Sequence, residues 1–342
     1  MRRFRSSVAR LALVAMLLLA ACAPPPQVHT LSGPTMGTVW TVRLAGLPAD
    51  VTVPRLRAEI EALLETANAQ MSTYRDDSEI TRFNRAPAGT AMTVSEDFAR
   101  VLAAALALAE DTGGAYDPTV GPLVNLWGFG PDGHRDRAPE DAAIAAMRER
   151  VGWQRLRFDA ATRTLVQPGG VYLDLSSIAK GDAVDRIAEH LAARGVAAAL
   201  VDIGGDMRLF GRKPDGSGWR VAIERPVPGT RDVHTIIEPG DRAVATSGSY
   251  RNFFRDGDRE FSHTIDPRSG RPVAHGLVSV TVIDESCLRA DALATALTVL
   301  GPEEGYAFAE VRGLAVLLLV REGDSVAERM TPAFARYLER AP

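Results

Sequence analysis

The sequence predicts a mixed α+β protein in which largely antiparallel sheets pack against helices. Segments with helical periodicity interleave with short apolar segments typical of strands. The later strand-like segments follow one another through short turns, which favours antiparallel pairing. No internal repeat is present in the 342 residues, a length that suits one large domain or two fused lobes.

Five segments show the pattern of amphipathic helices. Ser95 is typical of a helix N-cap, and Gly195 and Gly301 stand where helices commonly end. The predicted helices span 54–70, 95–111, 139–150, 182–194 and 288–300.

Eight further segments have the composition of strands. Asp256-Gly257 and Gly323-Asp324 between apolar segments predict hairpin turns. The predicted strands span 153–158, 171–175, 197–203, 207–211, 219–224, 233–238, 277–283 and 314–321.

The N-terminus has the layout of a secretory signal. Basic residues precede an apolar run at 11–21 that is too short to span a bilayer comfortably. Leu19-Ala20-Ala21-Cys22 resembles a lipobox, which makes Cys22 the expected lipidated residue; an ordinary signal peptide cut before Ala23 or later is the alternative. We therefore expect a lipoprotein signal peptide at 1–21, a Pro-rich tether at 22–32 and one catalytic domain at 33–342.

Composition excludes several classes of site. The net charge is −4 with both signs interspersed, so a nucleic-acid partner is not expected. With Cys22 consumed by lipid, Cys287 has no disulfide partner. No Gly-x-Gly-x-x-Gly, phosphate-binding Gly-Lys-Ser/Thr or Cys-x-x-Cys motif occurs, which argues against a Rossmann site, a P-loop and a zinc centre.

Asp291 and Thr295 are polar residues inside an otherwise apolar helix. They stand four residues apart and therefore share one helix face. A carboxylate and a hydroxyl suit a hard cation such as Mg²⁺ or Ca²⁺, with carbonyl and phosphate oxygens completing the shell. Alternatively, the two form a satisfied polar pair in which Thr295 bonds back to the preceding turn.

Two segments end strands where a ligand could approach. Segment 174–185 leads into a helix N-terminus, where free amides and Lys180 attract an anion; a capping turn of Asp174 and Ser176 is the alternative. Segment 201–206 contains paired glycines that permit close backbone approach to a ligand or form a tight turn.

Aromatic and histidine residues supply further candidates. Tyr116 or Trp127 could stack on a flat heterocycle, or either could fill the core. His263 stands at a strand end and could move a proton, or it could be structural.

Eight blocks together resemble the ApbE family of FAD:protein FMN transferases, across roughly residues 33–320. Such an ordered set is far more specific than any single motif. The blocks are TMGT (35–38), STYRDDSEITRFN (72–84), the loop 113–130, DLSSIAKGDAVD (174–185), VDIGGD (201–206), ATSGSYRNFF (245–254), SHTIDPRSGRPV (262–273) and ADALATAL (290–297).

The resemblance implies a two-lobed, T-fold-like body and a Mg²⁺-dependent enzyme with FAD as substrate. Such enzymes transfer FMN to a threonine hydroxyl of an acceptor flavoprotein through a phosphodiester bond and release AMP. It implies that Asp291 and Thr295 bind Mg²⁺ with the carbonyls of Ser177 and Ala294, and that His263 assists removal of the acceptor proton. The residues implied for the flavin and its pyrophosphate are Met36, Tyr74, Ala115, Tyr116, Asp117, Asp174, Lys180 and Ile265.

One departure and two alternative functions accompany this interpretation. Ser176 and Ser177 stand where the family often has glycine, which leaves a carbonyl ligand possible because it needs no particular side chain. A Mg²⁺-dependent FAD pyrophosphatase would use the same site with water as nucleophile. A non-catalytic flavin-binding lipoprotein would need the pocket but not the paired Asp291 and Thr295. In either case we expect a lipid-anchored protein of the bacterial envelope that faces the periplasm.

Replacing Cys22 tests the predicted anchor. We expect Cys22→Ser to move the protein from the membrane fraction to the soluble or precursor fraction, because the acceptor of the lipid is lost. Fractionation with mass analysis of the mature N-terminus measures this. Unchanged membrane association with cleavage at another site would contradict the lipobox.

Overall fold

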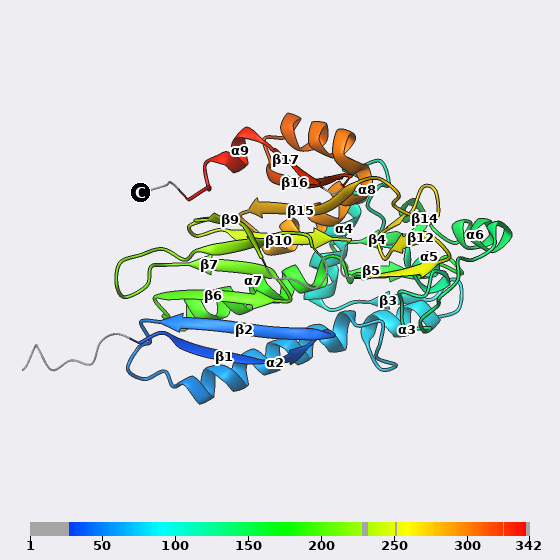
Figure 1. Ribbon diagram of the computed structural model, residues 1–342. Coiled ribbons are helices and arrows are strands. Elements are labelled where there is room, and N and C mark those ends of the chain that lie inside the picture. The colour runs from blue at the N-terminus through cyan, green and yellow to red at the C-terminus, as the bar shows by residue number, and fades with distance from the viewer. Residues whose placement is uncertain (1–26, 228–231, 250–251, 324, 340–342) are drawn as a thin grey trace, which may run out of the picture.

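A computed structural model describes residues 27–227, 232–249, 252–323 and 325–339. The predicted signal peptide and Cys22 lie outside these residues. The centre of the described chain is an eight-stranded sheet in the order β1-β2-β6-β7-β10-β15-β16-β17, with every neighbouring pair antiparallel (Figure 1). Its strands are β1 (His29–Thr35), β2 (Thr38–Ala45), β6 (Ala198–Ile203), β7 (Asp206–Phe210), β10 (Ala243–Gly248), β15 (Leu277–Asp284), β16 (Ala315–Glu322) and β17 (Ser325–Met330).

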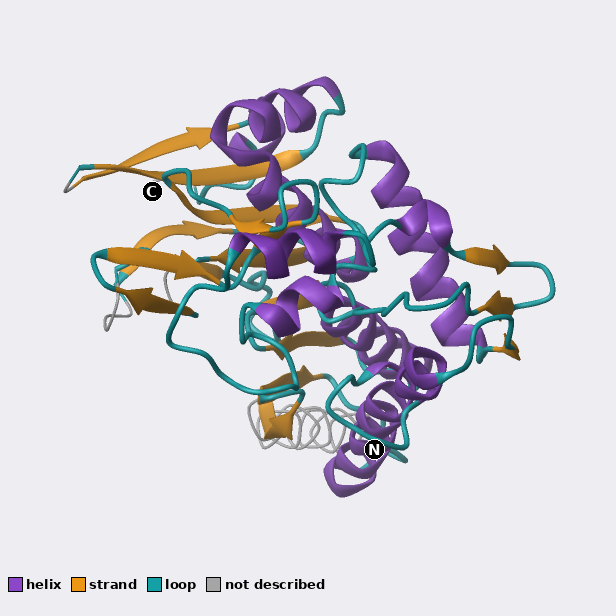
Figure 2. Cartoon of the chain, turned by 90° about the vertical axis from the view of Figure 1, so that its right-hand side faces the viewer, coloured by secondary structure: helices purple, strands orange, loops and turns teal. Residues whose placement is uncertain are grey.

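Helices cover one face of this sheet, as Figure 2 shows from the side. The alternation of side chains along a strand explains the two-sided burial: in β6, Val201 and Ile203 face the helices while Ala198 and Leu200 face the opposite layer. No helix in the described residues is long and apolar enough to cross a membrane. The helices on this face are α2 (Val53–Met71), α4 (Glu96–Asp111), α7 (Ala179–Ala193) and α8 (Cys287–Val311).

A thinner layer covers the other face. It consists of the hairpin β8 (Val221–Glu224) and β9 (Val233–Ile237) with the short helix α9 (Pro332–Ala335). Trp219 and Phe334 are buried in the apolar cluster between this layer and the sheet. The sheet is therefore covered on both sides, and strands such as β15 and β16 carry buried residues on both faces.

The smaller elements lie at one end of the sheet and have an apolar core of their own (Figure 1). Trp127, Phe254 and Phe261 pack together there with ring centroids 5.2–6.3 Å apart. This smaller lobe, with the confirmed mixed α+β class, agrees with the two-lobed body that the resemblance implied. The remaining elements are α3 (Glu79–Arg85), β3 (Ala91–Thr93), α5 (Gly121–Leu126), α6 (Asp141–Arg148), η1 (Trp153–Arg155), β4 (Arg157–Asp159), β5 (Thr164–Val166), β11 (Phe253–Asp256), β12 (Arg259–Ser262), β13 (Ile265–Asp266) and β14 (Arg271–Pro272).

The segment 171–175 is not a strand, contrary to the prediction from its apolar composition. Its backbone is bound by a side chain instead: Leu173 donates to Asn84 Oδ1 (2.7 Å), and Asn84 Nδ2 donates back to the Leu173 carbonyl (2.9 Å). Asp174 also donates its amide to the Pro118 carbonyl (2.8 Å). The backbone N–H and C=O groups of an extended apolar segment can thus find hydrogen-bond partners without a neighbouring strand. No local sequence pattern reveals such partners.

Three further elements differ from the prediction. The segment predicted as a strand at 153–158 begins as the 3₁₀ turn η1. Helix α7 begins at Ala179, three residues before the predicted start. Gly301 breaks the regular geometry of α8 with φ 82°, but Pro302 opens a second helical stretch at once, so Gly301 is a kink between two helical parts.

A carboxylate of α7 caps the N-terminus of α8. Asp185 Oδ1 accepts from the Cys287 amide (2.9 Å), and Asp185 Oδ2 accepts from the Leu288 amide (3.0 Å) and the Ser286 hydroxyl (2.8 Å). Arg208 of β7 pairs with the same carboxylate at 3.2 Å. Asp185 therefore joins two helices and the sheet through charge-assisted hydrogen bonds.

Removing this carboxylate should destabilise the whole fold. We expect Asp185→Ala to lower the free energy of unfolding by about 2–4 kcal/mol, because two helix amides and an arginine lose their partner. Urea unfolding measures this, with Glu189→Ala, an exposed position on the same helix, as the matched control. A loss below about 0.5 kcal/mol, the scale of an ordinary surface change, would contradict the capping role.

Candidate active site

The N-terminal ends of α7 and α8 meet beneath one end of the sheet. Just as Asp185 of α7 caps α8, Asp291 of α8 receives an amide of α7: Gly181 donates its N–H to Asp291 Oδ2 at 3.0 Å. Each helix thus supplies a carboxylate to the other. The positive ends of the two helix dipoles therefore meet at this place.

Gly181 makes this close approach possible. A Cβ atom at this position would lie 2.3 Å from the Cys287 carbonyl oxygen and 2.8 Å from the Leu288 Cα. Both are backbone atoms and cannot rotate away, so a side chain at this position would separate the helices. The glycine in the 174–185 segment therefore has a packing reason that only the fold reveals.

Lys180 lies between two acidic residues from different elements. Its ammonium nitrogen forms an ion pair with Asp206 at the start of β7 and lies 3.5 Å from Asp291 Oδ1. Burial acts to lower the pKa of Lys180, but Asp206 and Asp291 outweigh it and raise the pKa. Burial, aided by the charge of Asp206, raises the pKa of Asp291. Lys180 is therefore firmly cationic at the place where the helix amides converge.

The hydroxyl of Thr295 is available for a ligand. Thr295 is half-buried and forms no hydrogen bond with any residue that the structure describes, so the predicted alternative of a back-bonded pair does not occur at this position. The back-bonding hydroxyl is that of Thr298, which donates to the Ala294 carbonyl at 2.8 Å. The Ala294 carbonyl is therefore already engaged.

Of the two carbonyl groups predicted to bind a metal, those of Ser177 and Ala294, only that of Ser177 is without a hydrogen bond among the residues that the structure describes. Gly181, which would normally donate to the carbonyl four residues earlier, donates to Asp291 instead. Within the described residues the Ser177 carbonyl accepts no hydrogen bond. No cluster of three or more His, Cys, Asp or Glu side chains suited to a metal occurs in the described part of the chain. Asp291, Thr295 and the Ser177 carbonyl form a hard-oxygen set that fits Mg²⁺ only if a ligand supplies further oxygens.

The aromatic ring of Tyr116 is buried behind the site and cannot stack on a ligand. It is 2% exposed, and its hydroxyl accepts a hydrogen bond from the Ser177 hydroxyl at 3.0 Å. Burial raises the pKa of Tyr116, with smaller contributions from nearby Asp291 and Asp174. Tyr116 thus fixes the Ser177 turn, and the alternative in which this aromatic residue fills the core is the one observed.

Asp117 and Ala115 contribute to the same loop. Asp117 Oδ1 accepts from the Thr119 amide (2.8 Å) and hydroxyl (2.6 Å), and Asp117 Oδ2 accepts from the Trp153 amide (3.1 Å). Ala115 is buried. The carboxylate of Asp117 therefore holds the loop that follows α4. Any contact of residues 115–117 with a ligand would come through their backbone.

Asp174 and Tyr74 form the more exposed side of the site. Asp174 Oδ1 accepts from the Ser176 amide (2.9 Å) and hydroxyl (2.5 Å), so the predicted capping turn is present. Tyr74 is 69% exposed, and its hydroxyl donates to the Phe129 carbonyl at 3.4 Å. Partial burial raises the pKa of Tyr74, and the charge of Asp174 adds to the effect. An exposed aromatic ring anchored at its hydroxyl is well suited to stacking.

Met36 occupies a strained position at the tip of the β1–β2 hairpin. Its φ is 46° and that of Gly37 is 72°, so both central residues of the two-residue turn lie in the left-handed region. Asparagine or glycine is usual there, and a methionine carries a cost. Strain of this kind marks candidate functional residues.

His263 has one ring nitrogen bound and the other available. Its Nδ1 lies 3.1 Å from the Asn252 carbonyl, which can only accept, so Nδ1 carries the proton and Nε2 has the lone pair. Burial lowers the pKa of His263, and the nearby charge of Lys180 lowers it further. His263 is therefore a neutral base at pH 7 within electrostatic reach of Lys180.

Ile265 and Trp127 lie in the core of the smaller lobe. Ile265 is 5% exposed in β13, and Trp127 is 1% exposed and donates its indole N–H to the Gly270 carbonyl at 2.9 Å. Trp127 is thus a core residue and not a stacking platform. Only a rim contact with a ligand is open to Ile265.

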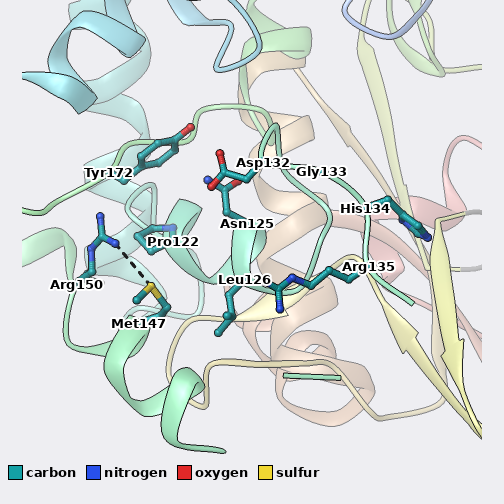
Figure 3. A pocket seen from close by; sticks show the side chains of 10 residues that line it. All are labelled: Pro122, Asn125, Leu126, Asp132, Gly133, His134, Arg135, Met147, Arg150 and Tyr172. Carbon is teal, nitrogen blue, oxygen red and sulfur yellow. Dashed lines mark hydrogen bonds between the residues drawn. The ribbon is translucent and has the colours of Figure 1, made fainter. Parts of the chain in front are cut away.

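A cavity of about 430 Å³ opens beside α5 and α6 (Figure 3). Tyr172, Asn125 and Asp132 converge at one side of it. Burial raises the pKa of Tyr172, and the charge of Asp174 adds to the effect. None of the residues predicted for the flavin or the metal lines it.

Sequence reasoning missed Asp206, Asp185 and Tyr172. Asp206 belongs to the quoted VDIGGD block, but only the glycines of that block were given a role. Its ion pair with Lys180 joins residues 26 positions apart. Asp185 ends the 174–185 block, and nothing local indicates that it caps a helix about a hundred residues later.

Together these features indicate a class of site. Two helix N-termini that meet, a half-buried lysine, and a hydroxyl and a carbonyl without hydrogen-bond partners among the described residues are features that suit a phosphate-containing ligand. The ApbE family model matches residues 36–318, and the chain belongs to the ApbE family. A relative from Vibrio cholerae named FAD:protein FMN transferase is 45% identical and covers 96% of this chain and 98% of its own length.

Solved structures agree with the family assignment. The flavin transferase ApbE from Vibrio cholerae has a TM-score of 0.85 at 45% identity, covering 92% of this chain and 100% of that one. The apo form of the flavinyl transferase ApbE from Pseudomonas stutzeri has a TM-score of 0.85 at 43% identity, covering 93% and 98%. The predicted family and fold are confirmed.

Proposed function

We propose that this chain transfers FMN from FAD to a threonine hydroxyl of an acceptor flavoprotein and releases AMP. The observation that carries the proposal is the half-buried Lys180 at the N-terminus of α7, beside Asp291 and the open Thr295 hydroxyl. A pyrophosphate is the part of FAD that such a site suits, because the positive ends of two helix dipoles and a lysine stabilise the charge of phosphate oxygens. The names of the relatives support the same reaction.

Asp291, Thr295 and the Ser177 carbonyl are the residues we propose to hold Mg²⁺. A bound Mg²⁺ would neutralise charge on the phosphate oxygens and so favour cleavage of the pyrophosphate. The engaged carbonyl of Ala294 would have to share its hydrogen bond with Thr298 to take part. Tyr116 positions Ser177 through its hydroxyl, and Gly181 orients Asp291.

His263 is the proposed base for the acceptor threonine. Its Nε2 is free to accept a proton because the Asn252 carbonyl keeps Nδ1 protonated. A threonine hydroxyl is a weak nucleophile, so a base within hydrogen-bond reach accelerates attack by roughly 10²–10⁴-fold. Tyr74, anchored at Phe129, is the proposed stacking surface for a flat ring of FAD.

The proposed flavin transfer is distinguished from FAD hydrolysis by its product. Incubation with FAD, Mg²⁺ and an extract of periplasmic proteins, followed by mass spectrometry, should reveal a peptide that carries FMN on threonine. Release of FMN and AMP alone would identify the pyrophosphatase, and absence of any FAD turnover would leave a flavin carrier.

We also propose that the chain is lipidated at Cys22 and faces the periplasm. The support is the lipobox after a basic segment.

Substitutions at the proposed metal ligands should impair catalysis without unfolding the chain. We expect Asp291→Asn to lower activity strongly and Thr295→Val to lower it less. Added Mg²⁺ should rescue Thr295→Val better, because the charged ligand remains. FMN transfer against Mg²⁺ concentration measures this.

Thr298→Val is the matched control for the metal ligands, since the Thr298 hydroxyl bonds to Ala294 on the same helix. It should retain wild-type Mg²⁺ dependence. Lowered melting temperature with unchanged activity per folded molecule in Asp291→Asn or Thr295→Val would show that these residues are structural.

The pKa of His263 predicts the acidic limb of the pH profile. Because burial lowers that pKa, the neutral base persists below the usual value of about 6.5, and activity should fall only as pH drops further. His263→Ala should slow transfer by roughly 10²–10⁴-fold, remove this limb and leave FAD affinity nearly intact. Single-turnover rates against pH, with FAD titration by fluorescence, measure this. Collapse of FAD binding together with unfolding would assign His263 a structural role.

A further inference from the structure

Lys180 and a divalent cation would compete for the same carboxylate oxygen. Asp291 Oδ2 is engaged by the Gly181 amide at 3.0 Å. Asp291 Oδ1 is the oxygen left for a cation, and it faces the Lys180 ammonium at 3.5 Å. Two cations at one oxygen repel each other, so metal binding at Asp291 requires Lys180 to move away.

Asp206 provides a second, fixed partner for Lys180. It is 2% exposed and forms the first residue of β7, where it pairs with Ile203 across the Gly204-Gly205 turn. Both glycines have positive φ, and Asp202 Oδ1 accepts from the Gly205 amide at 2.8 Å. The turn therefore holds Asp206 in place, while the side chain of Lys180 is 30% exposed and can move.

We propose that Asp206 is a positioning residue that retains Lys180 at the site when a divalent cation displaces it from Asp291. In the absence of metal, Lys180 contacts both carboxylates. With metal bound, Asp206 keeps the ammonium beside the α7 N-terminus, where it can contact a phosphate oxygen of the ligand. This inference rests on the proposed metal site at Asp291 and Thr295.

The inference predicts opposite changes in metal affinity for two substitutions. Lys180→Met removes the competing cation and leaves two unpaired carboxylates, so the Kd for Mn²⁺ without FAD should fall about five-fold or more. Asp206→Asn leaves Asp291 as the main partner of Lys180, so the Kd for Mn²⁺ should rise about five-fold or more. Electron paramagnetic resonance of free Mn²⁺, or calorimetry, measures both on the full chain.

Two control variants separate the contact from general charge effects. Lys213→Met removes the only other lysine of the chain. Asp202→Asn removes a carboxylate of the same turn and keeps an oxygen for the Gly205 amide. Both should keep the Kd for Mn²⁺ within about two-fold of the wild-type value.

The outcomes distinguish this inference from the proposed function. If the wild-type protein binds Mn²⁺ but Lys180→Met binds it no more tightly, or Asp206→Asn no more weakly, the positioning role is overturned and the metal site stands. If both variants only lose thermal stability, with unchanged Kd per folded molecule, the pair is structural and the inference is again overturned. A wild-type protein that binds no Mn²⁺ would overturn both the metal site and the inference.

Discussion

The site depends on an exchange of carboxylates between α7 and α8. Asp185 of α7 accepts the first amides of α8, and Asp291 of α8 accepts an amide of α7. The first two amides of α8 and the Gly181 amide of α7 are therefore paired, and the two helix ends are fixed against each other. The arrangement requires Gly181, because any side chain there would meet the backbone of α8. It also frees the Ser177 carbonyl from the helical hydrogen-bond pattern.

The electrostatics of the site follow from this geometry. Lys180 lies between Asp206 and Asp291, and its charge adds to the burial that lowers the pKa of His263. A cation that is held by two buried carboxylates costs less than an isolated buried charge, yet it stays close to a place where phosphate oxygens can bind. The residues proposed for binding, for metal coordination and for proton transfer are thus coupled through one lysine.

Much of this could be predicted from the sequence. Periodicity located α2, α4 and α6 closely, and short apolar segments located β6, β15 and β16. Segment 171–175 was mistaken for a strand because its partner is the side chain of Asn84, which lies 89 residues away. The shared helix face of Asp291 and Thr295 followed from helical spacing, and the assignment of Lys180 to the pyrophosphate, which the family resemblance implied, stays a prediction. Asp185 and Asp206 could not be found, because their roles depend on which helix ends and turns the fold brings together. The burial of Tyr116 and Trp127 likewise depends on tertiary packing.

The most direct test of the account is to locate a divalent cation in crystals of the protein grown with Mn²⁺ and collected at a wavelength where manganese scatters anomalously. The account predicts one peak in contact with Asp291 Oδ1, the Thr295 hydroxyl and the Ser177 carbonyl, with Lys180 paired to Asp206 alone. A peak elsewhere, or Lys180 still in contact with Asp291 while manganese is bound, would contradict it.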